Sequence, residues 1–342
     1  MTLLLKTAKN CVTLLIEVLR VDISSKYQEK VDSYKLNSTC LWKLGLLRKE
    51  DRKFLIDFGS LHAFVKVPHS LTYKLNTYPE VNAEIGYSDN HLATTSELIA
   101  SKLFKQLGFL TADYFPQRRY GLYYLASPNF LEGVCQYVTL SKLLEKRRKT
   151  KAYETTEEML LDAMLNSSNN ISYVLDNRQF FLQFMTKECY DKYIAYMLVA
   201  LFTFSNDEHN GNIILCKRKN AKKFEDVFIY DKESTGFNYY LALGISFRDI
   251  KFELFTYNRP STDILVNKLN ENYDYKYKIL KALIEKGEIG KKHIDLIKQY
   301  VNIDFDKLCE EVASENEIVL QKSQLDFYKL GQDCAGELIC EI

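Results

Sequence analysis

The chain has 342 residues, of which 46% are hydrophobic and 27% charged, and its formal net charge at pH 7 is +1. This composition is typical of a globular protein, with enough chain for one large domain or two lobes. A nearly neutral charge gives no electrostatic reason to expect direct binding to nucleic acid. The eight cysteines include no C-x-x-C pair, which predicts a reduced, cytoplasmic protein without structural zinc.

The N-terminus contains no apolar run long enough for a secretory signal, and no segment predicts a membrane span. A signal read by a dedicated bacterial secretion apparatus would escape this test.

Strand patterns dominate the first part of the chain. Two apolar runs within residues 41–58, separated by a charged turn, predict a β-hairpin. The next segment, SLHAFVKVPHS, predicts a short strand that Pro68 stops, with Lys66 in its middle. A lysine on an edge strand can also lie there only because its ammonium group reaches out to water.

A helix is predicted over residues 94–109, where apolar residues recur at helical spacing and Gly108 closes the pattern. Glu97 would then lie in the first turn, where the helix dipole favours a carboxylate whether or not it has another role. Residues 112–125 predict two further strands joined by a turn at 117–119.

The second part of the chain is mainly helical in pattern. Residues 155–203 predict helices that end in an apolar helix just before Asp207, and helical patterns return from about residue 247. The basic run at 146–151 is either a solvated helix end or a contact for phosphate or anionic lipid. A strand-rich part followed by a helix-rich part predicts an α+β protein with two lobes, residues 1–130 and 131–342.

The residues best suited to chemistry lie between 204 and 238. Asp207, His209 and Asn212 fall in one short loop, and two strand-like runs joined by a basic turn then lead to Asp231. Phosphoryl transfer needs a carboxylate that orients the attacking hydroxyl, and an asparagine and a second carboxylate that hold metal ions. The step from Asp207 to Asn212 is the D-x-x-x-x-N spacing of a kinase catalytic loop. The same cluster is also typical of a simple turn between apolar segments.

Taken in order, several motifs resemble the HipA-type serine/threonine kinases. They are the strand AFVKVP, the helix with Glu97, the connector YLASPNFL, and the loop NDEHNGN followed by IYD. That family includes bacterial toxin kinases and secreted, cell-translocating kinases, and it shares a distant fold with phosphatidylinositol kinases. The resemblance spans about residues 35–235 and implies a two-lobed protein-kinase-like fold that uses ATP and Mg²⁺.

The resemblance also implies roles for individual residues. Lys66 would contact the α- and β-phosphates, and Glu97 would steady it by an ion pair. Asp207 would be the catalytic base, and Asn212 and Asp231 would bind magnesium.

The nucleotide would have further contacts. Residues 126–130 would form the hinge beside adenine, with Ala126, Asn129 and Phe130 among them, and His209 would support the catalytic loop. The family's glycine-containing phosphate loop is replaced by residues 33–42, which have no glycine. Ser38 and Thr39 could bind phosphate oxygens there, and a serine of this loop can be autophosphorylated in the family.

Three functions stay open at this point. The first is a serine/threonine protein kinase that acts as a bacterial toxin or as an effector translocated into a host cell, with a protein substrate and an antitoxin or host partner. The second is a phosphoinositide or small-molecule kinase, toward which only the basic run leans. The third is a pseudokinase or binding module, which the missing glycine loop favours.

Overall fold

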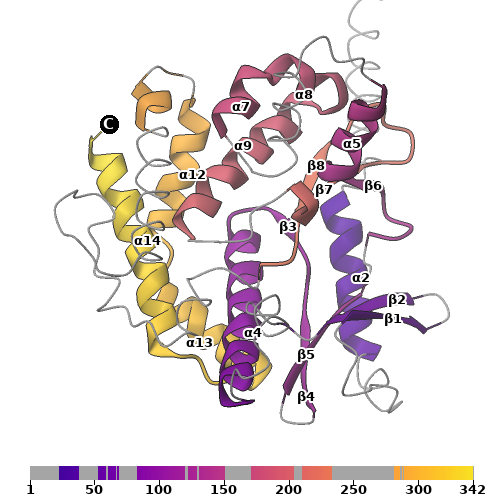
Figure 1. Ribbon diagram of the computed structural model, residues 1–342, viewed down its shortest axis with the longest axis vertical. Helices are drawn as coiled ribbons and strands as arrows, with labels where there is room; N and C mark the ends of the chain where they lie inside the picture. The colour runs from indigo at the N-terminus through magenta and orange to yellow at the C-terminus, as the bar shows by residue number, and fades with distance from the viewer. Residues whose placement is uncertain are drawn as a thin grey trace, which may run out of the picture.

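The computed structural model describes residues 23–37, 53–58, 61–66, 68, 83–119, 122–128, 131–150, 171–203, 210–232, 281–285, 287 and 289–341. Within these ranges the chain is a mixed α+β protein with two four-stranded sheets, and helices lie on both sides of them (Figure 1).

The first sheet contains the strand that carries Lys66. Its strands lie in the order β1-β2-β5-β4, and neighbouring strands are antiparallel. They are β1 (Lys53–Phe58), β2 (Leu61–Lys66), β4 (Phe115–Arg119) and β5 (Leu122–Pro128). Lys66 is the last residue of β2 and pairs with Leu125 of β5.

The observed strands differ from the predicted ones in two details. The hairpin partner of residues 53–58 is the following strand, 61–66, and residues 41–52 lie outside the described part. The turn expected at 117–119 is wrong, because these residues belong to β4 and pair with β5. Pro116 also lies within β4, because an edge strand tolerates a proline whose missing N–H would point away from the neighbouring strand.

The second sheet places the hairpin that precedes Asp231. Its strands lie in the order β3-β8-β7-β6. They are β3 (Leu110–Thr111), β6 (Gln136–Thr139), β7 (Ile213–Lys217) and β8 (Asp226–Ile229). The antiparallel β7–β8 hairpin confirms the two predicted runs on either side of a basic turn, and β3 pairs with β8 in parallel.

Helix α2 (Ile23–Asn37) packs against the β3 and β8 strands. The ring of Tyr27 lies edge-on to Phe228 at 5.6 Å, and its hydroxyl donates to the Thr111 carbonyl at 2.6 Å. The phosphate loop expected from residue 33 is therefore helical as far as Asn37.

Helix α4 (Ala83–Gln106) runs through the centre of the molecule. It begins at Ala83, although its apolar periodicity becomes clear only near Thr94, because residues 83–93 are polar and include Ser, Asp and Asn, which usually favour caps. Glu97 consequently lies in the body of the helix. The first-turn explanation of its position is wrong. Gly108 ends the helix with a left-handed φ of 82°, as the sequence predicted.

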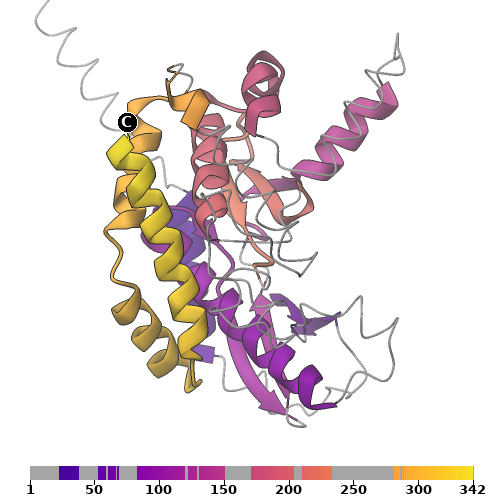
Figure 2. The ribbon, with the colours of Figure 1, turned by 60° about the vertical axis from the view of Figure 1, so that its left-hand side comes forward.

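The remaining helices form the other half of the core. They are α5 (Leu140–Thr150), α7 (Ile171–Asp176), α8 (Arg178–Phe184), α9 (Lys187–Phe202), α12 (Lys291–Val301), α13 (Phe305–Asn316) and α14 (Lys322–Glu341). From Tyr193 to Phe202 helix α9 is apolar on every face, and the helix lies against α12, α14 and β8. The long helix α14 extends from the α9 region down to α4 and α13, whereas α5 projects from the opposite side (Figure 2).

Helix α9 begins at a defined cap and ends at Phe202, just before the predicted catalytic loop. The side chain of Thr186 accepts the N–H of Cys189 at 3.1 Å. The short 3₁₀ turn η2 (Asn210–Asn212) then leads into β7. Residues 204–209 are therefore preceded by α9 and followed by η2.

Candidate functional site

Lys66 lies between two carboxylates that come from distant parts of the chain. Its Nζ atom is 2.8 Å from Oε2 of Glu97 and 2.5 Å from Oδ1 of Asp231. The side chains of Lys66, Glu97 and Asp231 are 12%, 1% and 19% exposed, respectively. Because a buried carboxylate is costly without a counter-charge, the ammonium group offsets the burial of Glu97.

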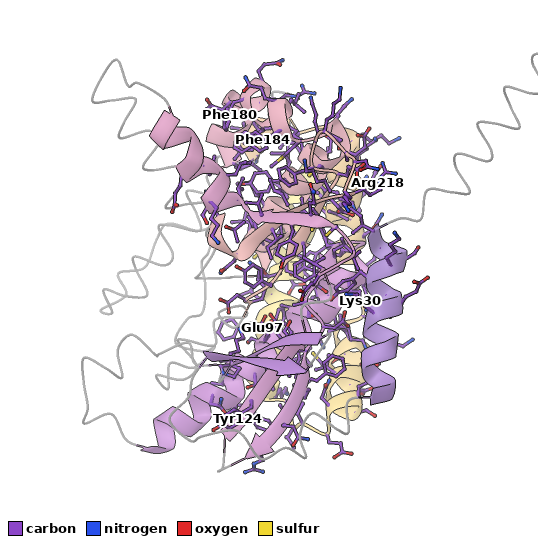
Figure 3. The ribbon with its side chains drawn as sticks, turned by 90° about the vertical axis from the view of Figure 1, so that its right-hand side faces the viewer. Lys30, Glu97, Tyr124, Phe180, Phe184 and Arg218 are labelled. Atoms are coloured by element: carbon purple, nitrogen blue, oxygen red, sulfur yellow. The ribbon has the colours of Figure 1, made fainter. Side chains whose placement is uncertain are left out.

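Glu97 is carried by the buried face of α4, close to the middle of the molecule (Figure 3). About two turns earlier on the helix, the buried amide of Asn90 binds the backbone of the first sheet. Its Nδ2 donates to the carbonyls of Pro68 and Tyr123 at 2.9 and 3.0 Å, and its Oδ1 accepts the Tyr123 N–H at 2.7 Å. Asn90 thereby ties α4 to β5 and to the segment that leaves the Lys66 strand.

Asp231 follows β8 with an unusual backbone conformation. Its φ is 62°, in the left-handed region that costs most residues roughly 1–2 kcal/mol and that aspartate and asparagine tolerate better. The hydroxyl of Tyr114 accepts the Asp231 N–H at 3.2 Å. On the other side, the buried Lys232 side chain donates to the hydroxyl of Tyr196 and lies 4.9 Å from the centre of its ring. These contacts hold a strained residue of the kind that collects at functional sites.

Tyr114 contacts more than one member of the site. Its ring centre is 5.6 Å from Nζ of Lys66. Burial, together with the nearby Glu97 carboxylate, raises the pKa of Tyr114 well above its usual range. The tyrosine is therefore a neutral hydroxyl at physiological pH, and it can support Asp231 without adding charge.

Asn212 lies beside Asp231. Its Nδ2 donates to the Asp231 carbonyl at 3.4 Å, and the turn that contains it is fixed by the hydroxyl of Tyr230, which donates to the Gly211 carbonyl at 2.6 Å. In the same turn, Asn210 accepts the hydroxyl of Tyr193 of α9 at 3.3 Å. Carboxylate and amide oxygens are ligands that suit Mg²⁺, so Asn212 and Asp231 are the described side chains that could hold a magnesium ion.

Of the other candidate residues, only Ala126 lies in the described part of the chain. Ala126 is a buried residue of β5 and pairs with Val65, next to Lys66. The remaining six lie outside the described residues: Ser38, Thr39, Asn129, Phe130, Asp207 and His209. Their predicted roles stay predictions.

Sequence reasoning did not identify Asn90, Tyr114 or Lys232. Tyr114 lies in a stretch with no motif, and its importance depends on contacts with residues 66 and 231. The polar run around Asn90 resembled a loop, and only its burial shows that the amide is a structural tie.

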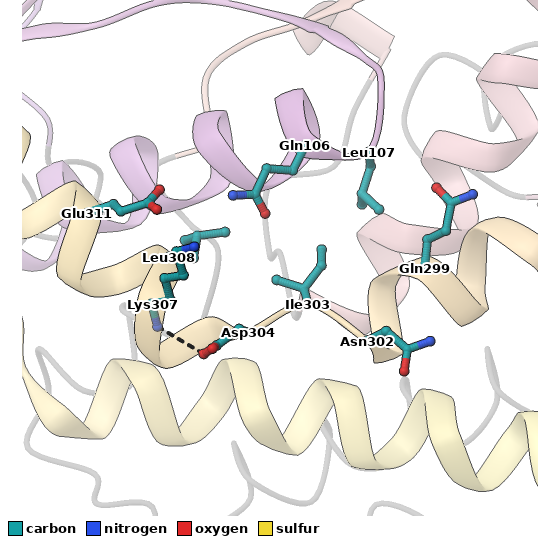
Figure 4. Close-up of a pocket in the computed structure, with 9 residues that line it drawn as sticks. All are labelled: Gln106, Leu107, Gln299, Asn302, Ile303, Asp304, Lys307, Leu308 and Glu311. Atoms are coloured by element: carbon teal, nitrogen blue, oxygen red, sulfur yellow. Dashed lines mark hydrogen bonds between the residues drawn. The ribbon is translucent and has the colours of Figure 1, made fainter.

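A pocket of about 460 Å³ opens away from these residues, where the end of α4 meets the α12–α13 junction (Figure 4). Its lining includes Gln106 and Leu107 of the α4 end, Asn302 and Ile303 of the junction, and Lys307 of α13. Neither Lys66, Glu97 nor Asp231 lines it.

Other features of the described residues bear on the earlier predictions. Six cysteines lie in this part of the chain, and each of them is a free thiol. Among the helices described, none combines the length and the apolar character needed to cross a membrane.

Comparison with solved structures gives a similar fold. The Helicobacter pylori proinflammatory kinase CtkA matches with a TM-score of 0.52 and 15% sequence identity, over 88% of this chain and 95% of the CtkA chain. No family model matches the sequence, and no curated protein matches it. The fold is therefore similar to that of a kinase.

Proposed function

We propose that this protein is an ATP- and magnesium-dependent kinase of the HipA-like type that phosphorylates serine or threonine in a protein. The observation that carries the proposal is the meeting of Lys66, Glu97 and Asp231 at one point. A lysine from a strand, a glutamate from a helix and an aspartate after a hairpin are the parts that kinases bring together around a triphosphate. The similarity of the fold to that of CtkA supports the same function.

Each residue would have a definite task. Lys66 would bind phosphate oxygens with its ammonium group, and Glu97 would keep that group in place. Asn212 and Asp231 would hold magnesium, which supplies positive charge next to the phosphate oxygens. Asp207 would accept the proton of the attacking hydroxyl.

We also propose that the nucleotide binds between a lobe of residues 1–130 and a lobe of residues 131–342, with residues 126–130 beside adenine. Lys66 and Glu97 come from the first part, and Asn212 and Asp231 come from the second. CtkA is described as a proinflammatory kinase, which supports a role for this protein as an effector.

The test is mass spectrometry of the purified protein after incubation with Mg·ATP, together with labelled ATP and separate samples of protein substrate and anionic vesicles. We expect phosphate on serine or threonine. We expect Asp207→Asn to lower transfer by at least about a hundredfold, the scale of a lost general base, with nucleotide binding largely intact.

Each alternative gives a different result. Label on the vesicle lipid in place of protein would indicate a lipid kinase. Nucleotide binding without any transfer would indicate a binding module, and native-rate transfer by the Asp207→Asn protein would show that Asp207 is not the base.

A further inference from the structure

Helix α14 is hydrogen-bonded to α4 directly beside Glu97. The side chain of Gln324, in the first turn of α14, is fully buried against α4. Its Nε2 donates to the Leu92 carbonyl and to Oγ of Ser96, both at 3.0 Å, and its Oε1 accepts the hydroxyl of Thr95 at 2.7 Å.

These contacts are stronger constraints than ordinary surface contacts. Both polar atoms of the amide have partners, and the three partner residues are themselves buried, so breaking the contact leaves polar groups without water. A second link between α4 and the C-terminal helices, Lys102 with Glu311 and Glu315 of α13, is more exposed and contributes less.

The position of the Gln324 hydrogen bonds matters because one of their partners, Ser96, is adjacent to Glu97. A movement of α4 along or around its axis would carry the Glu97 carboxylate away from Lys66, and Gln324 opposes that movement. Asn90 holds the same helix to the first sheet, so α4 is bound near Glu97 by its own buried amide, which contacts the strands, and by a buried amide from α14.

We propose that Gln324 is a positioning residue for the Glu97–Lys66 ion pair, through which the C-terminal helix keeps α4 in its paired position. The proposal rests on the kinase function proposed above. It makes α14, which does not itself carry Lys66 or Glu97, part of the structure that orients Lys66.

The test compares Gln324→Leu with Gln332→Leu. Gln332 lies on the same helix, and its Nε2 donates to three carbonyls, those of Tyr300, Val301 and Ile303, which belong to the end of α12 and the connection to α13. The two substitutions therefore remove the same kind of group from the same helix, and only the first contacts α4.

The measurements are the kcat and ATP KM of phosphate transfer, the Tm, the chemical labelling of Lys66 by an amine reagent, and hydrogen exchange of the α4 amides. For Gln324→Leu we expect kcat to fall about ten- to a hundredfold, because displacement of a catalytic group by about 1 Å has an effect of this size. We also expect faster labelling of Lys66 and faster exchange in α4. Gln332→Leu should lower Tm to a similar extent and leave kcat and Lys66 labelling as in the native protein.

Thr95→Val provides a milder version, since it keeps the shape of the side chain and removes the hydroxyl that Gln324 accepts. It should change kcat and Lys66 labelling in the same direction. If Gln324→Leu and Gln332→Leu have equal effects on kcat and neither changes Lys66 labelling, Gln324 has only a structural role. If the native protein transfers no phosphate, the kinase proposal fails, and Lys66 labelling and α4 exchange still decide whether Gln324 positions the pair.

Discussion

The hydroxyl of Tyr114 is a single atom that supports Asp231, and its removal tests the left-handed conformation at that residue. Tyr114→Phe keeps the ring beneath Lys66 and removes the acceptor for the Asp231 N–H. A neutral hydrogen bond contributes about 0.5–1.5 kcal/mol, so we expect kcat/KM for ATP to fall roughly two- to tenfold. Steady-state kinetics against ATP and Mg²⁺ would measure it.

Tyr137→Phe is the matched control, because Tyr137 is exposed on β6. We expect native kinetics from it. Equal kinetics from the two tyrosine variants would show that the Tyr114 hydroxyl does not support the site.

The carboxylate of Asp231 can be removed without disturbing its backbone. Asparagine also tolerates φ near 62°, so Asp231→Asn should fold normally while it loses the charge that faces Lys66 and magnesium. We expect phosphate transfer to fall by at least about a hundredfold, as for other lost catalytic groups. Titration calorimetry with ATP should show that magnesium no longer strengthens binding. Unchanged magnesium dependence would remove Asp231 from the metal site.

Among individual residues, sequence reasoning found those whose types recur in kinases and missed those that act through contacts with distant parts of the chain. Lys66, Glu97 and Asp231 were recognised because their motifs occur in order. Tyr114 and Gln324 were not recognised, because neither has a motif of its own. Their hydrogen-bond partners lie 117 and 232 residues away in the sequence.

Between elements, α14 approaches the end of α9 closely at Gly331. A Cβ atom at Gly331 would lie 2.0 Å from the Phe202 carbonyl oxygen and 2.8 Å from the hydroxyl of Tyr300. Because backbone cannot yield easily, Gly331→Ala should separate the helices and lower the free energy of unfolding by about 1–3 kcal/mol. Urea denaturation would measure this loss.

Gly336→Ala tests the same substitution on the same helix without the clash. Its Cβ would meet only Cγ1 of Val301 at 3.8 Å, an ordinary contact. Alanine has the higher helix propensity, so we expect a gain of up to about 1 kcal/mol. A destabilisation equal to that of Gly331→Ala would contradict the close-approach explanation.

The elements that the sequence predicted well are those with strong periodicity. The apolar α9, the amphipathic α12 and the β7–β8 hairpin all match. The first half of α4 was missed because residues 83–93 include Ser, Asp and Asn, which usually favour caps and turns over helix interiors. The two-residue β3 carries no sequence signal, since its pairing with β8 is set by the rest of the fold.

For the molecule as a whole, two partly buried histidines predict that stability depends on pH. Burial lowers the pKa of His91 on α4 and of His293 on α12 below the ordinary value of 6.5. The Nε2 of His293 lies 3.2 Å from the Asp191 carbonyl, and its buried Nδ1 has no hydrogen-bond partner among the described residues. Protonation of either ring would place a charge in a poorly solvated position.

The unfolded chain binds protons more readily at these two sites than the folded protein does. Their contribution to stability is therefore complete above pH 6.5 and decreases as the pH falls toward the lowered folded-state pKa values. Thermal denaturation between pH 8 and pH 5 should show this decline, and a double variant with glutamine at both positions should show a smaller one. An identical decline in the double variant would assign it to other groups.

The general architecture was predictable because strand-rich and helix-rich stretches follow each other along the chain. The α+β character and the similarity to a kinase fold agree with that expectation. The way the two sheets share the segment around residues 110–119 was not predictable, because β3 and β4 are close in sequence and yet join different sheets.

The parallel pairing of β3 with β8 constrains how the site can open. The segment that leaves α4 is bonded to the strand that leads to Asp231, and the bonding continues through the Ala112 N–H to the Ile229 carbonyl at 3.0 Å. Glu97 and Asp231 are therefore linked through β3 and β8, and Asn90 also links the helix of Glu97 to the sheet that carries Lys66. A movement between the sheets that separates Lys66 from Glu97 would therefore break the Asn90 hydrogen bonds, whereas one that separates Glu97 from Asp231 would break the β3–β8 pairing.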